Sequence, residues 1–305
     1  MFVGVLWCWW HVIIVCMIEV HELSKIGIGT FNIDLENPEM AVEVLLEQVR
    51  LGANFIDTSF MYADGGVMRF LGERFFPRVK REEIFVVTQI EPMVEKLEDI
   101  EEQLDKYLGA MDLEYVDCLM LHHPFFTKMS LIETFTAMNE MVGKGKARCL
   151  GFSNGSAEQL REVQAKFPLK VFLGLYNLEN KNNEDNGIID FCRENDIAFV
   201  AYQPLRRNRT AERNYPEMVA LAEKYGRMQN QVILNWIFRE KGLRALIKSS
   251  SLERTRENFG AFDFEMEKAD YEILNEFWSA EFDAIEVDWE DRGGVRIDKL
   301  PNQLD

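Results

Sequence analysis

Short apolar segments alternate with longer amphipathic segments along the chain from residue 25 onward. The short segments are nearly continuous in hydrophobic residues, which is typical of parallel strands covered on both faces. We therefore predict eight strands, at KIGIGTF (25–31), NFIDTS (54–59), IFVVTQ (84–89), VDCLMLHH (116–123), ARCLGFSN (147–154), VFLGLYN (171–177), IAFVAYQPL (197–205) and ALIKSS (245–250).

The segments between them carry apolar residues at helical spacing, and several begin at a capping residue and end at Gly or Asn. Clear examples are PEMAVEVLLEQVRLG (38–52), LEDIEEQLDKYLGAM (97–111), SLIETFTAMNEMVGKG (130–145) and NEDNGIIDFCREN (183–195). Strict alternation of strand and helix predicts a parallel sheet covered by helices. Eight such units fit a single-domain α/β fold, the closed (β/α)8 TIM barrel, better than an open doubly wound sheet.

The amino-acid composition of the chain limits which kinds of molecule it can bind. The 305 residues include 34 Lys and Arg against 52 Asp and Glu, a formal net charge of −18. Such a surface repels nucleic acid and anionic membranes, so an anionic cofactor needs a local basic cluster. The cysteines are few and irregularly spaced, which predicts free buried thiols in a reducing, cytoplasmic compartment and no metal site. They are Cys8, Cys16, Cys118, Cys149 and Cys192.

The two ends of the chain differ from the repeating pattern. Residues 1–18 contain no Lys, Arg, Asp or Glu, lack the features of a secretory signal, and are barely long enough to span a bilayer. We predict that residues 1–16 are an extension outside the fold. The two alternatives are an apolar element packed on the barrel and a membrane anchor. We expect the barrel to cover 17–280, followed by an acidic tail over 281–305.

Polar residues follow the predicted strands at their C-terminal ends, where barrels of this kind place their active sites. Reduction of a carbonyl builds negative charge on its oxygen, which requires a proton donor and a hydrogen-bonding partner. Tyr62 is the candidate donor and His122 the candidate partner. His122 and His123 are adjacent on a predicted strand, so we expect them on opposite faces and not in a shared metal site.

The spacing of these residues resembles the aldo-keto reductase family over about residues 22–280. In that family an Asp, a Tyr, a Lys and a His meet around the substrate carbonyl, which implies Asp57, Tyr62 and His122 here. The Lys position is occupied by Gln89. Singly, Asp57 could be a helix cap and His122 a core histidine, but these readings do not explain the shared order along the chain.

The resemblance also implies a nicotinamide cofactor, NADP(H). The motif GFSN implies that Ser153 and Asn154 hold the nicotinamide carboxamide. In AYQPL, Tyr202 is similar to the aromatic residue that stacks on the nicotinamide ring, and Leu205 is counted as a cofactor contact with it. Thr30, after the first strand, is a further cofactor contact.

The adenosine end of the cofactor is implied by KSSSLERTREN. Lys248, Ser249 and Arg254 correspond to the residues on the 2′-phosphate, and Glu257 and Asn258 to those near the adenine. No G-x-G-x-x-G follows the first strand, so the cofactor is not expected to bind in the Rossmann manner. Where the family usually has a carboxamide-binding Gln in the sixth strand, this chain has Leu173.

The change at position 89 alters the expected electrostatics. A phenol titrates near pH 10, and the family's Lys is expected to bring that pKa closer to neutrality. Gln89 can hydrogen-bond Asp57 and Tyr62 but supplies no cation. Asp57 then lacks an ion-pair partner, and its charge would raise the pKa of Tyr62 further unless Asp57 stays protonated.

Two functional hypotheses follow. The first is an NADP(H)-dependent oxidoreductase that reduces a small aldehyde or ketone, with Tyr62 as donor and an altered acid. The alternative is a non-catalytic NADPH-binding sensor or scaffold on the same fold. A phosphate-binding barrel lyase or isomerase would also use a basic end of the eighth strand, but it leaves GFSN and Tyr202 unexplained.

Overall fold

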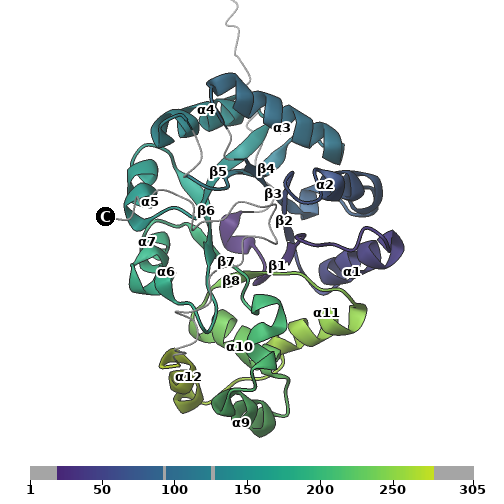
Figure 1. Ribbon diagram of the computed structural model, residues 1–305, viewed down its shortest axis with the longest axis vertical. Coiled ribbons are helices and arrows are strands. Elements are labelled where there is room, and N and C mark those ends of the chain that lie inside the picture. The colour runs from purple at the N-terminus through teal and green to yellow at the C-terminus, as the bar shows by residue number, and fades with distance from the viewer. Residues whose placement is uncertain (1–18, 92–93, 125–127, 278–305) are drawn as a thin grey trace, which may run out of the picture.

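Eight parallel strands close into a barrel in sequence order in the computed structural model, which describes residues 19–91, 94–124 and 128–277. Figure 1 looks along the barrel and shows the helices as a ring around the strands. Every predicted strand overlaps an observed one, so the predicted (β/α)8 barrel is confirmed. The strands are β1 (Ile26–Gly29), β2 (Phe55–Ser59), β3 (Phe85–Ile90), β4 (Val116–Leu121), β5 (Ala147–Ser153), β6 (Leu169–Leu175), β7 (Ala198–Tyr202) and β8 (Arg244–Ile247).

The helices lie between the strands and beyond the last one. They are α1 (Pro38–Arg50), α2 (Gly66–Phe70), α3 (Leu97–Met111), α4 (Leu131–Gly143), α5 (Ala157–Gln164), α6 (Asn182–Asp185), α7 (Ile188–Glu194), α8 (Arg209–Glu212), α9 (Pro216–Tyr225), α10 (Gln229–Asn235), α11 (Leu252–Phe259) and α12 (Lys268–Asn275). The single helix predicted over 183–195 is wrong. Gly187 has a φ of 76°, a left-handed conformation that divides the segment into α6 and α7.

Side-chain caps fix where several helices begin. Ser130 accepts a hydrogen bond from the backbone N–H of Glu133, and the Glu133 carboxylate accepts one from the Ser130 N–H. Ser156 and Gln159 form the same reciprocal pair at the start of α5. These pairs satisfy N–H groups that the first helical turn leaves without partners, and the start predicted at Ser130 is confirmed.

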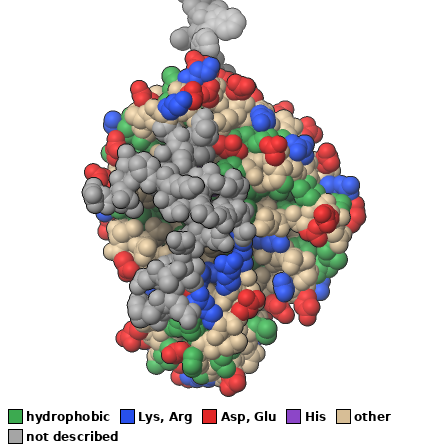
Figure 2. Space-filling model, viewed as in Figure 1, with side chains coloured by type: hydrophobic (Ala, Val, Ile, Leu, Met, Phe, Trp, Pro, Cys, Tyr) green, Lys and Arg blue, Asp and Glu red, His purple; other side chains and the backbone are tan. Residues whose placement is uncertain are grey.

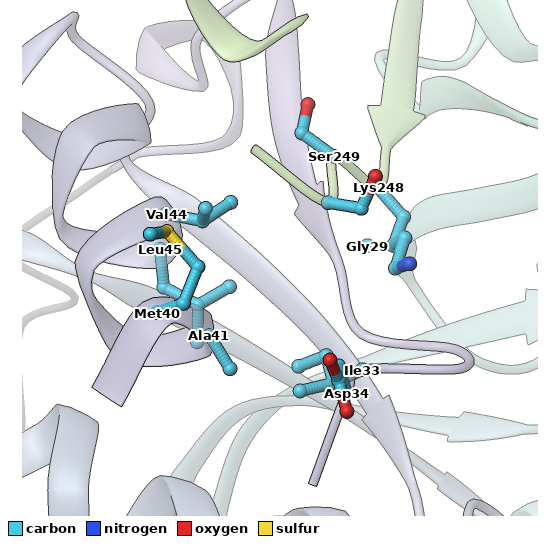
Figure 3. Close-up of a pocket in the computed structure, with 10 residues that line it drawn as sticks. Gly29, Ile33, Asp34, Met40, Ala41, Val44, Leu45, Lys248 and Ser249 are labelled. Carbon is cyan, nitrogen blue, oxygen red and sulfur yellow. The ribbon is translucent and has the colours of Figure 1, made fainter. Parts of the chain in front are cut away.

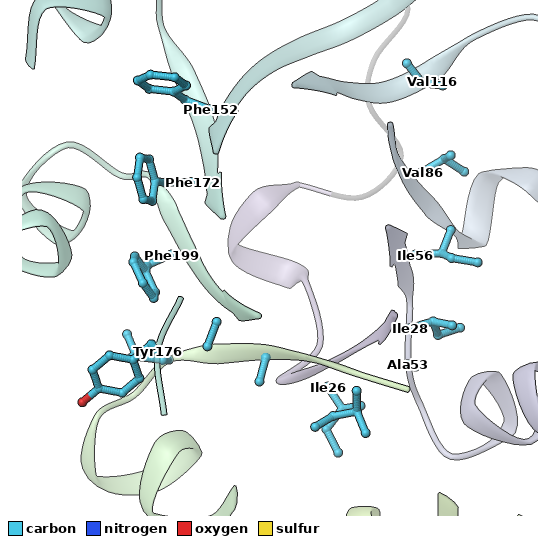
Figure 4. Packing of buried hydrophobic residues seen from close by; sticks show 14 of the residues in the cluster. Ile26, Ile28, Ala53, Ile56, Val86, Val116, Phe152, Phe172, Tyr176 and Phe199 are labelled. Atoms are coloured by element: carbon cyan, nitrogen blue, oxygen red, sulfur yellow. The ribbon is translucent and has the colours of Figure 1, made fainter. Parts of the chain in front are cut away.

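The core has two layers, one between strands and helices and one inside the barrel. In the outer layer Phe152, Phe172 and Phe199 come from successive strands and lie in a row of ring contacts (Figure 4). Inside the barrel, Phe55 packs where Gly27 has no side chain. A Cβ at Gly27 would lie 2.1 Å from the Phe55 ring, so this close approach requires glycine.

A short 3-10 turn, η1 (Val20–Glu22), closes the N-terminal end of the barrel. Val20 and the buried Leu23 pack against the apolar cluster of the barrel interior. The Arg244 guanidinium donates to the backbone oxygens of His21 and Leu23, at 3.1 and 3.0 Å. The segment is therefore part of the folded barrel, whereas the predicted extension over 1–16 and the predicted tail over 281–305 lie outside the described residues.

Three cysteines lie in the described part of the chain, and all three are free thiols. Cys118 and Cys192 are buried, whereas Cys149 is half-buried. Cys8 and Cys16 lie outside the described residues. No helix within that part has the length and apolar character needed to cross a membrane.

Candidate active site

The ends of β2 and β3 bring Asp57 and Gln89 into direct contact. Both side chains are buried, and the Gln89 Nε2 donates a hydrogen bond of 2.7 Å to the Asp57 Oδ1. From the residue after β1, the Thr30 hydroxyl donates to the Asp57 backbone oxygen at 2.8 Å. The predicted contact of the Gln89 amide with Asp57 is therefore present, whereas the buried Gln89 Oε1 has no hydrogen-bond partner among the described residues. Thr30 supports the end of β2.

The environment of Asp57 favours its neutral form. Burial raises the pKa of its carboxyl from the ordinary 3.8 to about 7, and the hydrogen bond from Gln89 lowers it only in part. Near neutral pH the carboxyl is therefore present in both protonation states. A Lys at position 89 would stabilise the carboxylate by charge, whereas the Gln89 amide supplies a hydrogen bond without charge.

Tyr62 lies in the turn after β2 and is half-buried. Its backbone N–H donates to the Ser59 oxygen at 3.1 Å, which ties the turn to the strand end. The ring meets Phe31 edge to face, with centroids 5.2 Å apart. Phe31 follows β1 and was not among the predicted site residues.

His122 and His123 are both buried, and their rings stack with centroids 4.2 Å apart and planes 20° from parallel. The prediction that they point to opposite faces is wrong. The strand ends at Leu121, so strand alternation no longer applies to the pair. The described residues contain no group of three or more His, Cys, Asp or Glu placed to hold a metal ion.

Asn154 joins the ends of β4, β5 and β7 through its side chain. Its Nδ2 donates to the His122 backbone oxygen and to the Ser153 hydroxyl, both at 2.9 Å, and its Oδ1 accepts from the Tyr202 hydroxyl at 2.6 Å. The backbone of Asn154 has a φ of 58°, a conformation that Asn tolerates better than most residues. The Ser153 hydroxyl also donates to the oxygen of Leu173 in β6, at 3.2 Å.

The end of β8 forms a pocket against β1 and α1. Lys248 and Ser249 line it with Gly29 and Asp34, and apolar side chains of α1 line the opposite wall (Figure 3). Partial burial lowers the pKa of the Lys248 ammonium, Asp34 opposes this, and the charge of Arg254 adds to it. A cation and a hydroxyl thus face one small cavity.

The other predicted contacts of the adenosine end lie on α11. The Asn258 amide donates to the Ser249 hydroxyl at 3.2 Å, and Arg254 Nη1 donates to the Ser250 hydroxyl at 3.4 Å. Glu257 is half-buried and accepts through its backbone oxygen from the Gln231 amide at 2.9 Å. Leu205, predicted as a cofactor contact after β7, packs against the hydrophobic core.

Sequence reasoning missed the arginines after β7. Arg206 is buried and ion-pairs with the fully buried carboxylate of Glu179, which Arg213 also approaches at 3.5 Å. Arg207 is exposed, and its guanidinium lies 5.3 Å from the centroid of the Phe31 ring. The run RRNRTAER was the available signal, because four arginines in eight residues are unusual in so acidic a chain.

The model of the Aldo/keto reductase family matches residues 25–279. The chain belongs to this family. Asp57, Gln89, Asn154 and Tyr202 all lie within the matched residues.

Its similarity to individual relatives is moderate but extends over most of each chain. Aldo-keto reductase family 1 member C18 of Rattus norvegicus is 26% identical over 294 residues, with 84% of this chain and 88% of the relative covered. Methylglyoxal reductase YeaE of Escherichia coli is 24% identical and covers 85% and 92%. A thermostable aldo-keto reductase solved with the inhibitor epalrestat has a TM-score of 0.77 at 28% identity, covering 83% and 94%.

Proposed function

We propose that this protein is an NADP(H)-dependent oxidoreductase that reduces a small aldehyde or ketone. The observation that carries the proposal is the hydrogen-bonded set of strand ends, in which Asp57 contacts Gln89 and Asn154 links His122 to Tyr202. Both sets of contacts lie at the C-terminal ends of the strands, where such folds place their chemistry. The surface charge argues against nucleic acid as a partner.

The donor set of this face suits a dinucleotide. Near β5, the Ser153 hydroxyl and the Asn154 amide can hold a carboxamide, beside the half-buried ring of Tyr202. Near β8, Lys248 and Ser249 present a cation and a hydroxyl to one pocket. An aldo/keto reductase from Klebsiella pneumoniae, 24% identical with a TM-score of 0.75, was solved in complex with NADP and acetate. When bound, such a cofactor supplies a hydride.

The side chains around the substrate carbonyl donate the proton and orient the carbonyl oxygen. In this proposal the Tyr62 hydroxyl donates its proton to the carbonyl oxygen, and His122 orients that oxygen by a hydrogen bond. Gln89 holds Asp57 in place without supplying charge. A Tyr62 without a nearby cation is a weaker acid, so we expect slow turnover compared with a site that retains the Lys.

The alternative function, NADPH binding without turnover, rests on the same pair of residues, Asp57 and Gln89. Because the Gln89 amide carries no charge, Asp57 and Tyr62 lose the cation on which the family's acid depends, while Lys248 and Ser249 at the far end of the site are retained. A protein with this pattern could bind NADPH as a sensor or scaffold without turning it over.

Two measurements separate the hypotheses: titration of NADPH fluorescence, and NADPH consumption with a panel of aldehydes and quinones. We expect the parent to bind NADPH and to reduce at least one carbonyl. Tyr62→Phe should bind NADPH as the parent does but lose turnover, because it lacks only the hydroxyl. NADPH binding without turnover of any carbonyl by the parent would favour the sensor or scaffold.

A further inference from the structure

The turn after β7 has an unusual backbone for residues that carry side chains. Gln203, Arg206, Arg207 and Asn208 have φ values of 52°, 47°, 57° and 76°, all in the left-handed region that favours glycine. Such conformations persist where surrounding contacts hold them, and they occur often at ligand-binding sites. The side chains of this turn are therefore candidates for contact with a ligand.

Buried contacts hold the turn in place. Arg206 points inward to the buried Glu179 carboxylate, and the Asn177 amide donates to the Gln203 oxygen at 3.3 Å. Two neighbouring arginines thus take opposite roles. Arg206 anchors the turn, and Arg207 is exposed.

Arg207 and the proposed proton donor, Tyr62, both contact the ring of Phe31. The Arg207 guanidinium is 5.3 Å from the Phe31 centroid, and Phe31 is 5.2 Å from the Tyr62 centroid. Figure 2 shows Lys and Arg side chains gathered where Figure 1 places the turn after β7 and the end of β8. In a chain with a net charge of −18, this basic region attracts anions to the site.

We infer that Arg207 selects substrates that carry a carboxylate about one ring's length from the carbonyl carbon. This inference rests on the proposed function and names its substrate class. A guanidinium can bind a carboxylate through two parallel hydrogen bonds, while the face of Phe31 supports the guanidinium and the intervening part of the substrate. The carbonyl then lies beside Tyr62.

The test compares 4-carboxybenzaldehyde with 4-formylbenzamide, which have similar size but differ in charge. We expect the parent to prefer the carboxylate by at least tenfold in kcat/KM. Arg207→Gln should lose most of that preference through KM, with NADPH affinity unchanged. Arg209→Gln, two residues further along at the start of α8 and with the same loss of charge, should keep it. A parent preference near one, or an unchanged preference in Arg207→Gln, would overturn the inference.

Binding of the corresponding alcohols separates this inference from the proposed function. Calorimetry with 4-(hydroxymethyl)benzoate and 4-(hydroxymethyl)benzamide, with and without NADPH, needs no turnover. Tighter binding of the benzoate that Arg207→Gln weakens would support the inference even in an inactive protein. Equal binding of the two alcohols would refute it. A fall in NADPH affinity in Arg207→Gln with the substrate preference retained would assign Arg207 to the cofactor, also against the inference.

Discussion

Asp57 and Gln89 form a buried, hydrogen-bonded pair that contains no cation. The amide of Gln89 donates to the carboxyl of Asp57 at 2.7 Å, and burial raises the pKa of that carboxyl to about 7. A buried carboxyl without a cationic partner favours its neutral form. The protonation state of Asp57 therefore affects the stability of the fold.

Replacing Gln89 with Lys should restore the missing cation. The ammonium would lower the pKa of the Asp57 carboxyl and of the Tyr62 phenol, and one pKa unit corresponds to about 1.4 kcal/mol. We expect Gln89→Lys to raise the rate of aldehyde reduction at pH 7 by about tenfold or more, with little change in NADPH affinity. Gln89→Met, of similar size and uncharged, should not accelerate the reaction. A Lys variant slower than an active parent would mean that the amide itself takes part in proton transfer.

Replacing Asp57 with Asn should remove a loss of folding stability that grows as the pH rises. The folded pKa of Asp57 lies above its ordinary 3.8, so the folded state binds this proton more tightly than the unfolded state. The stabilising effect of this proton on the folded state is complete below about pH 4 and is lost as the pH rises to about 7. The stability of Asp57→Asn relative to the parent should therefore increase by about 2–3 kcal/mol between pH 5 and pH 8. Urea unfolding at the two pH values measures this, and a constant difference would rule out a neutral Asp57.

At the scale of elements, the sequence predicted what local chemistry determines. The strands were recognisable because a buried parallel strand is apolar along its whole length, and α4 because Ser130 carries a capping box. The division at Gly187 was missed because a glycine within an amphipathic segment has the same pattern whether its φ is helical or left-handed. The stacking of His122 on His123 depends on where β4 ends, and strand ends are the least predictable boundaries.

Much of the site could be predicted and part of it could not. The positions of Asp57, Gln89, Asn154 and Lys248 at the strand ends were predictable because strand order alone brings successive strand ends together in a barrel, while their roles stay predictions. Phe31 and Arg207 could not be placed, because they lie on turns whose paths depend on long-range contacts such as the buried pair of Arg206 and Glu179. Turns of that kind have no periodic pattern in the sequence.

The turn between β8 and α11 carries a prediction of its own. If Lys248, Ser249 and Arg254 hold the 2′-phosphate, NADPH should bind at least tenfold more tightly than NADH, since charged hydrogen bonds contribute about 1.5–3 kcal/mol. Lys248→Ala should lose most of this preference. Lys166→Ala, with the same change in net charge after α5, should keep it. Equal affinities for the two cofactors, measured by fluorescence titration, would refute the assignment.

On the scale of the whole molecule, the chain before β1 divides into two parts with different expected roles. Val20 and Leu23 fill the N-terminal end of the barrel, and Asn54 and Arg244 bind the backbone of this segment. Residues 1–16 are predicted to lie outside the fold. The boundary between folded barrel and extension should therefore fall close to Met17.

Two shortened chains test this boundary. A chain that starts at Met17 should melt at the same temperature as the full chain and be more soluble, because it loses only exposed apolar residues. A chain that starts at Ser24 should be destabilised by several kcal/mol, since it also loses the buried Leu23 side chain, worth about 2–5 kcal/mol, and uncovers the apolar barrel interior. Thermal unfolding monitored by circular dichroism measures both. A fall of several degrees on starting at Met17 would show instead that residues 1–16 pack on the barrel.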